Sequence, residues 1–102
     1  MKIQEALLNL ERRVAKLTMG TTPGTQLIRC LVVPENLPAN VHKDCPNLEQ
    51  GDSALVWALH LGPMGRRGRT WYGKTVQMAI RNAQRDLAEV EKNWVGASPS
   101  WW

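Results

Sequence analysis

Six basic residues stand close together in the second half of the chain, and their type and spacing suit the binding of anions. Between Ser53 and Arg85 there is no acidic residue, and the six are Arg66, Arg67, Arg69, Lys74, Arg81 and Arg85. Guanidinium groups hold phosphates and carboxylates through charge-assisted hydrogen bonds. Trp71 and Tyr72 lie among them and offer rings that stack on bases or support the loop. The segment therefore predicts a site for phosphate or carboxylate groups.

The elements expected around this segment would aim its charge outward. Three glycines and a proline over 62–69 predict a loop, and Thr75 or Thr70 can cap a helix expected over 74–94. The start of a helix favours anions, because its N–H groups are unpaired and its dipole is positive there. Opposite the apolar stripe of this helix lie four cations that predict a basic track: Lys74, Arg81, Arg85 and Lys92. A charge run of this kind is also typical of a solvated helix face.

The rest of the chain predicts a small mixed fold. Apolar residues at helical spacing predict a helix over 3–18, and apolar, partly alternating segments predict strands over 26–33, 53–61 and 69–72. The proline- and asparagine-rich segment 34–52 predicts a long loop, and 96–102 predicts a tail.

This order of elements predicts an α+β fold in a single domain over 1–102. Two to three strands would form a small antiparallel sheet, with the N-terminal and C-terminal helices packed on one face. The alternative is a helical hairpin in which the two apolar stripes pair as a coiled coil. Either stripe is also a candidate contact for a homo-oligomer.

The segment from Gly68 to Thr75, followed by Ala79, Ala83 and Leu87, resembles the entry to the last helix of double-stranded-RNA-binding domains. The resemblance covers roughly the last half of the chain, and Lys74 followed by Thr75 stands where that family has paired lysines. It implies the order helix, strands, helix and binding to duplex RNA. The same stretch resembles the strand-to-helix segment of HicB-type antitoxins, through Gly73-Lys74-Thr75 and the alanines.

Metal binding and catalysis receive little support. Cys30, His42, Cys45 and His60 are ligand types, but their spacing matches no zinc finger or knuckle, and Cys30 alternates as a core residue would. His42, Asp44 and Cys45 supply the residue types of a nucleophile and its base within one loop, a grouping that is common by chance. We therefore expect no enzyme activity, no cofactor, no metal, and two reduced thiols.

Bulk composition agrees with a folded binding protein. Hydrophobic residues make up 43% of the 102 residues, the formal net charge is +4, and no apolar run is long enough to cross a membrane. We expect a soluble, cytoplasmic protein with no membrane contact. Trp101 and Trp102 end the chain and either fold back on the core or contact a partner or second copy.

Two functions fit these observations. In the first, the basic loop and helix bind the nucleic-acid backbone with low sequence specificity, without catalysis. In the second, the same face binds an acidic protein surface, as a small interaction or inhibitor protein, of the kind that mobile elements encode.

Overall fold

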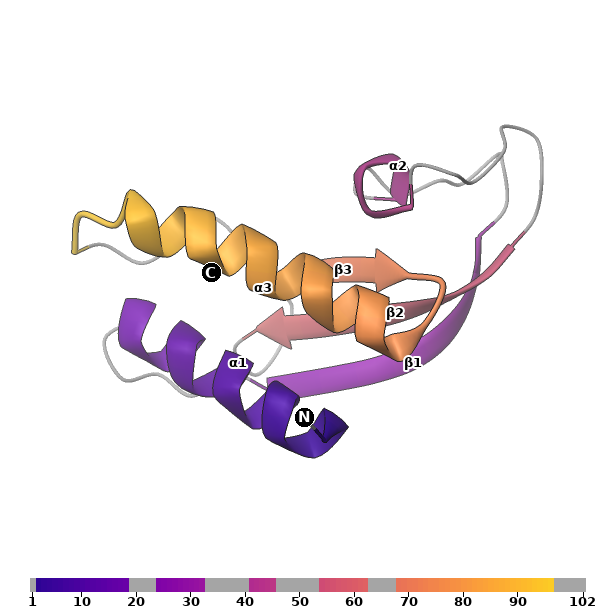
Figure 1. Cartoon of the computed structure of the whole chain (residues 1–102), viewed down its shortest axis with the longest axis horizontal. Helices are drawn as coiled ribbons and strands as arrows, with labels where there is room; N and C mark the ends of the chain where they lie inside the picture. The colour runs from indigo at the N-terminus through magenta and orange to yellow at the C-terminus, as the bar shows by residue number, and fades with distance from the viewer. Residues whose placement is uncertain (1, 19–23, 33–40, 46–53, 63–67, 97–102) are drawn as a thin grey trace.

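The computed structural model describes residues 2–18, 24–32, 41–45, 54–62 and 68–96. Their elements follow the order α1 (Ile3–Leu17), β1 (Gly24–Val32), α2 (Val41–Asp44), β2 (Ala54–Gly62), β3 (Arg69–Gly73) and α3 (Val76–Lys92). The strands form one antiparallel sheet in the order β1-β2-β3, and α1 and α3 lie side by side on one of its faces (Figure 1). The fold is therefore α+β, with the N-terminal and C-terminal helices on the same face of the sheet.

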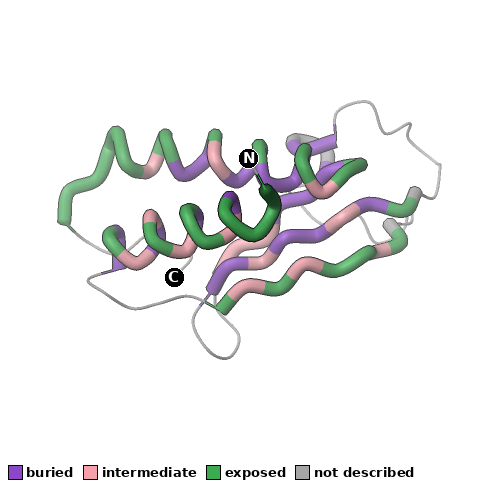
Figure 2. The backbone as a smooth tube through the Cα atoms, turned by 60° about the horizontal axis from the view of Figure 1, so that its bottom comes forward, coloured by how far each residue is buried: buried purple, intermediate pink, exposed green. Residues whose placement is uncertain are grey.

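The apolar stripes of the two long helices are buried inside this chain. Leu10 and Val14 of α1 and Ile80 and Leu87 of α3 pack with Trp71 and the inward residues of β2 in one core cluster. Burial follows the helical repeat on α1 and α3, whereas β2 has buried residues on both of its sides (Figure 2). The stripes pair with the sheet as well as with each other, so the coiled-coil alternative is wrong, and they are not available as an oligomer contact.

The segment 34–52, expected to be a loop, contains the short helix α2. It lies against the other face of the sheet, where Val41 and Cys45 pack with Val56, Ala58 and Tyr72 in a second cluster. The alternation in β2 therefore has two buried sides: Leu59 and Leu61 face the long helices, and Val56 and Ala58 face α2. The prolines and asparagines that predicted a loop gave no sign of this packing.

The approach of α3 to the sheet depends on glycine. A Cβ on Gly73 would collide with the backbone N of Ala79, and it would lie 2.8 Å from the carbonyl carbon of Met78. Thr75 then caps α3, because its side chain accepts a hydrogen bond from the Met78 N–H at 3.2 Å. The helix expected from residue 74 therefore begins at Val76, after a capped turn.

The far halves of β1 and β2 run beyond the two long helices (Figure 1). On the side of the sheet that carries these helices, Leu31 and Leu55 are direct cross-strand partners and are 58% and 56% exposed. Next to them, the Arg29 guanidinium lies over the Trp57 ring, 5.8 Å from its centroid.

Candidate functional site

Three of the predicted basic residues are exposed on α3 or just before it. Arg81 and Arg85, four residues apart, lie on one side of the helix, and Lys74 precedes the N-cap Thr75. The first turn of α3 has no acidic residue. Neither Lys74 nor Arg81 forms an ion pair with any residue that the structure describes. These two cations are therefore open to an external anion.

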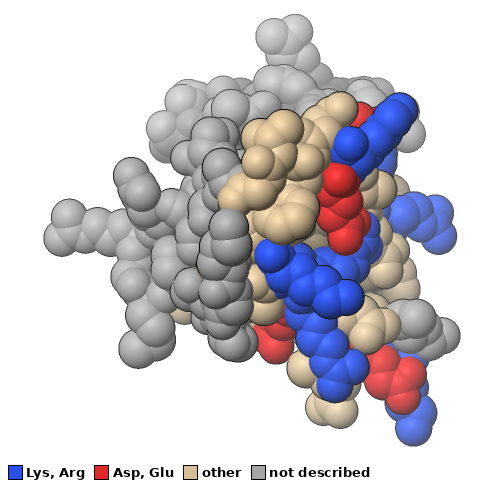
Figure 3. Space-filling model, turned by 90° about the vertical axis from the view of Figure 1, so that its left-hand side faces the viewer, with Lys and Arg blue, Asp and Glu red and all other residues tan. Residues whose placement is uncertain are grey.

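The C-terminal half of the predicted basic track is interrupted by acids. Lys92 is flanked by Glu89 and Glu91, and Glu91 forms an ion pair with Arg13 of α1. Figure 3 shows this end of the molecule, where basic and acidic side chains alternate over the described surface. The uncompensated charge of α3 is thus concentrated in its first three turns.

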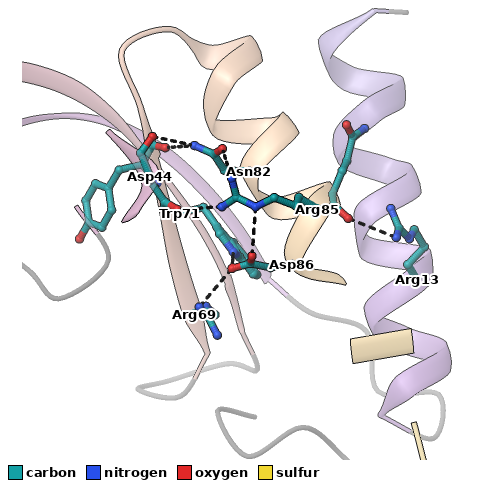
Figure 4. Close-up of polar contacts among 9 residues, drawn as sticks. Arg13, Asp44, Arg69, Trp71, Asn82, Arg85 and Asp86 are labelled. Carbon is teal, nitrogen blue, oxygen red and sulfur yellow. Dashed lines mark hydrogen bonds and ion pairs between the residues drawn. The ribbon is translucent and has the colours of Figure 1, made fainter. Parts of the chain in front are cut away.

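Two of the predicted binding arginines belong to an arginine–aspartate cluster, which we define as Asp44, Arg69, Asn82, Arg85 and Asp86 (Figure 4). The Arg69 Nη2 lies 3.1 Å from Oδ2 of Asp86. The Arg85 Nη2 lies 3.4 Å from Oδ1 of Asp44, and its Nε lies 3.5 Å from Oδ1 of Asp86. Both aspartates are buried, so each guanidinium compensates a carboxylate that has little access to water.

The cluster also closes the outer edge of β3. The backbone N–H of Tyr72 donates to Oδ2 of Asp44 at 2.8 Å, and the Tyr72 carbonyl accepts from Nδ2 of Asn82 at 2.7 Å. The same Asn82 amide donates to the Asp44 carbonyl at 3.2 Å, and its Oδ1 accepts from Nη1 of Arg85 at 3.2 Å. The cluster therefore joins α2, β3 and α3 through polar contacts.

Trp71 and Tyr72 are not stacking surfaces in this structure, so that part of the prediction is wrong. Trp71 is 1% exposed, and its indole Nε1 donates to Oδ2 of Asp86 at 2.9 Å. Tyr72 is buried on the opposite face of the sheet, in the cluster with α2. The physical reason is volume, because a small core gains most by burying its largest side chains. Trp71 supports Arg69, whose guanidinium lies 5.8 Å from the ring centroid.

Four predicted contact residues lie outside the described residues: Arg66, Arg67, Trp101 and Trp102. Sequence reasoning in turn missed Asp44, Asn82 and Asp86. Asp86 directly follows the acid-free segment in the sequence and Asp44 lies nine residues before it, and only the fold brings both against its arginines. The one available signal was that Asn82 and Asp86 fall four residues apart, between the apolar positions Ala79, Ala83 and Leu87.

The face of the sheet opposite the long helices has a hollow of about 320 Å³, lined by residues that include Ile28, Cys30, His60 and Tyr72. His60 Nδ1 lies 2.9 Å from Oγ1 of its cross-strand partner Thr70, and no carboxylate from the described part of the chain contacts this imidazole. Burial is the main cause that raises the pKa of the Tyr72 phenol, and nearby Cys30 and Asp44 add to it. The raised pKa favours the protonated, weakly nucleophilic form of the Tyr72 phenol.

The residues considered as metal ligands or nucleophiles are only partly placed. Cys30 and Cys45 are free thiols near the second cluster, and the side chain of His42 is outside the described set. Among the residues that the structure describes, no three His, Cys, Asp or Glu side chains gather as metal ligands would. Burial, reinforced by the charge of Asp44 and opposed by that of Lys74, raises the pKa of the Cys45 thiol.

Comparison of the chain with protein-family models, with curated proteins and with solved structures gives no match. None of the described helices has the length and apolar character needed to cross a membrane. The site must therefore be interpreted from its own geometry.

Proposed function

We propose that the protein is a non-catalytic binding protein that contacts the nucleic-acid backbone through the first three turns of α3 and the arginine-rich segment before β3. The observation that carries this proposal is the pair Lys74 and Arg81. Both are exposed and both lack an ion-pair partner among the described residues; Lys74 lies beside a helix start without acids, and Arg81 lies in the second turn. Helix starts and free cations attract phosphates by the same electrostatics.

The site favours contacts with phosphates over contacts with specific bases, because it offers positive charge but no exposed aromatic ring on which a base could stack. The two aromatic residues expected to stack on bases are buried, and the exposed residues in the first three turns of α3 are Gln77, Met78, Arg81 and Arg85. Contacts to phosphates position a protein on nucleic acid but carry no sequence information directly. Low sequence specificity follows.

The test is a fluorescence-anisotropy titration with labelled duplex RNA, duplex DNA and single strands of mixed sequence, at about 50 and 200 mM salt. Log affinity should fall linearly with log salt concentration, and Lys74→Ala with Arg81→Ala should reduce the slope by about 0.9 for each DNA phosphate that the variant no longer neutralises. The matched control is Arg12→Ala with Lys16→Ala, which removes two exposed charges from α1. The control should leave most of the slope in place.

The Arg66→Ala, Arg67→Ala double variant tests the contribution of the segment before β3. If wild-type protein binds no nucleic acid at the lower salt concentration, or if the α1 control loses as much affinity as the α3 variant, the proposal is wrong. Binding to an acidic protein surface would then become the leading hypothesis.

A further inference from the structure

The two edge strands of the sheet differ in whether their outward backbone groups have partners. At the β3 edge, Asp44 and Asn82 occupy the outward N–H and C=O of Tyr72. At the β1 edge, no described element pairs with the strand, which runs for nine residues. Exposed edge strands of monomers are usually short or protected by lysine, proline or bulges, whereas β1 contains no proline and the single charge of Arg29.

The ladder identifies which groups of β1 face outward. Because Tyr72 directs its backbone polar groups away from β2, its partner Ala58 directs its own toward β1, and Ala58 pairs with Ile28. Ile28 is therefore bonded to β2, and the alternate residues present free N–H and C=O groups at the edge. These residues are Thr25, Leu27, Arg29 and Leu31.

We propose that a second copy of this chain pairs with β1, strand to strand and antiparallel, about a two-fold axis at Ile28. This centre overlaps all nine residues, Gly24–Val32, and places Leu27 opposite the partner's Arg29 and Thr25 opposite the partner's Leu31. The outward groups of the two strands then form about eight hydrogen bonds, and the two sheets become one of six strands. The contact is self-complementary, as a two-fold interface requires.

Charge complementarity supports a second copy as the occupant. The Thr25 hydroxyl donates to the Glu11 carboxylate of α1, so Glu11 lies above the beginning of β1, on the same face of the sheet as Arg29. In the proposed register the partner's Thr25 is the diagonal cross-strand neighbour of Arg29. Long side chains reach across the distance between diagonal neighbours. Arg29, which forms no ion pair with a described residue of its own chain, then meets the partner's Glu11.

The exposed apolar residues support the same arrangement. Leu31 and Leu55 lie on the half of the β1–β2 hairpin that the chain's own helices leave uncovered (Figure 1). The antiparallel pairing brings the beginning of the partner's β1, with α1 above it, alongside this half. Leu8, which is 44% exposed and one turn before Glu11, would then add apolar surface to the contact.

The first test is the mass in solution by analytical ultracentrifugation from about 10 to 200 μM protein. The wild type should sediment at twice the 11.5 kDa of one chain. Ile28→Lys, at a residue that is 57% exposed, should remain folded by circular dichroism and raise the dimer dissociation constant about fivefold, because two ammonium groups would face each other. Met78→Lys, the same change at an exposed apolar residue of α3, is the matched control and should remain dimeric.

The second test fixes the register by cross-linking. Gln26 lies opposite the partner's Cys30 in the proposed pairing, so Gln26→Cys should form an intermolecular disulfide under mild oxidation. Adding Cys30→Ser should abolish it. Arg29→Glu and Glu11→Arg should each weaken the dimer, and the double exchange should restore it. A monomeric wild type over the whole concentration range, or a dimer whose dissociation constant Ile28→Lys leaves unchanged, would overturn the proposal.

Discussion

The indole Nε1 of Trp71 and the Arg69 guanidinium meet at the same oxygen, Oδ2 of Asp86, at 2.9 and 3.1 Å. A buried indole requires an acceptor for its N–H, and a buried carboxylate requires a cation or several donors. One carboxylate oxygen of α3 thus accepts the hydrogen bond of Trp71 and balances the charge of Arg69, two residues of β3. This contact fixes the end of the sheet under the helix that carries the candidate binding residues.

We predict that Asp86→Ala lowers the free energy of unfolding by about 2 to 3 kcal/mol, because it removes the acceptor of the Trp71 N–H, the carboxylate partner of Arg69 and one of the two carboxylates near Arg85. The value is at the low end for buried pairs, since half of the Arg85 side chain is exposed to water. Urea denaturation followed by circular dichroism measures the change. Glu89→Ala, an exposed acid on the same helix, should stay within about 0.5 kcal/mol of the wild type.

Gly73→Ala should destabilise the protein by about 1 to 3 kcal/mol, since the added methyl group meets the backbone of the first turn of α3. Backbone atoms cannot rotate away as a flexible side chain would. Gly24→Ala is the control, because its new Cβ would meet only the Gly62 carbonyl oxygen at 3.6 Å. Equal thermal midpoints for the two variants would show that α3 does not depend on this close approach.

Arg81→Ala and Arg85→Ala should separate binding from stability. Arg81 has no described ion-pair partner, so its loss should weaken nucleic-acid binding and change stability by less than about 0.5 kcal/mol. Arg85 compensates buried Asp44, so its loss should cost about 2 kcal/mol of stability with little change in the salt dependence of binding. Parallel urea and anisotropy measurements on both variants check this. The opposite pattern would place Arg85 in the binding site and Arg81 outside it.

Stability should fall on the alkaline side. Burial raises the pKa of both the Cys45 thiol and the Tyr72 phenol in the folded chain, so the unfolded chain loses these protons first as pH rises. The free energy of unfolding is therefore unaffected below the ordinary thiol pKa of about 8.5, and it decreases as pH rises through about 8.5 and then about 10. Urea denaturation at a series of pH values measures the decrease. The variant Cys45→Ala, Tyr72→Phe should lose less stability over the same range, and an identical loss would contradict the assignment.

The helices and the alternating strand could be predicted from the sequence because their residues report a local period. Leu10, Val14, Ile80 and Leu87 recur at helical spacing, and their burial against the sheet follows from that pattern. The helix α2 could not be predicted, because four residues between prolines and asparagines are too short to show a period. Its place is set by Val41 and Cys45 meeting Tyr72 across the sheet, which no local pattern contains.

The sequence predicted a basic surface on α3 but not which of its cations are paired with buried acids. Arg81 lies on the exposed side of α3 because the apolar stripe occupies the opposite side, and Lys74 is exposed just before the helix. The state of Arg69 and Arg85 depends on contacts with Asp44, 41 residues from Arg85 in sequence, and with Asp86. A segment free of acids in the sequence is therefore not free of them in space.

The arginine–aspartate cluster also limits how tightly this surface can hold a polyanion. Asp44 and Asp86 already occupy the guanidinium groups that a phosphate would seek, so they act as competitors covalently attached to the receptor and always present at the site. A ligand that recruited Arg69 or Arg85 would have to displace a carboxylate whose alternative is burial without a cation. Of the 13 basic residues in the chain, these two are thus reserved for the fold, and tighter binding through them would come at the expense of folding.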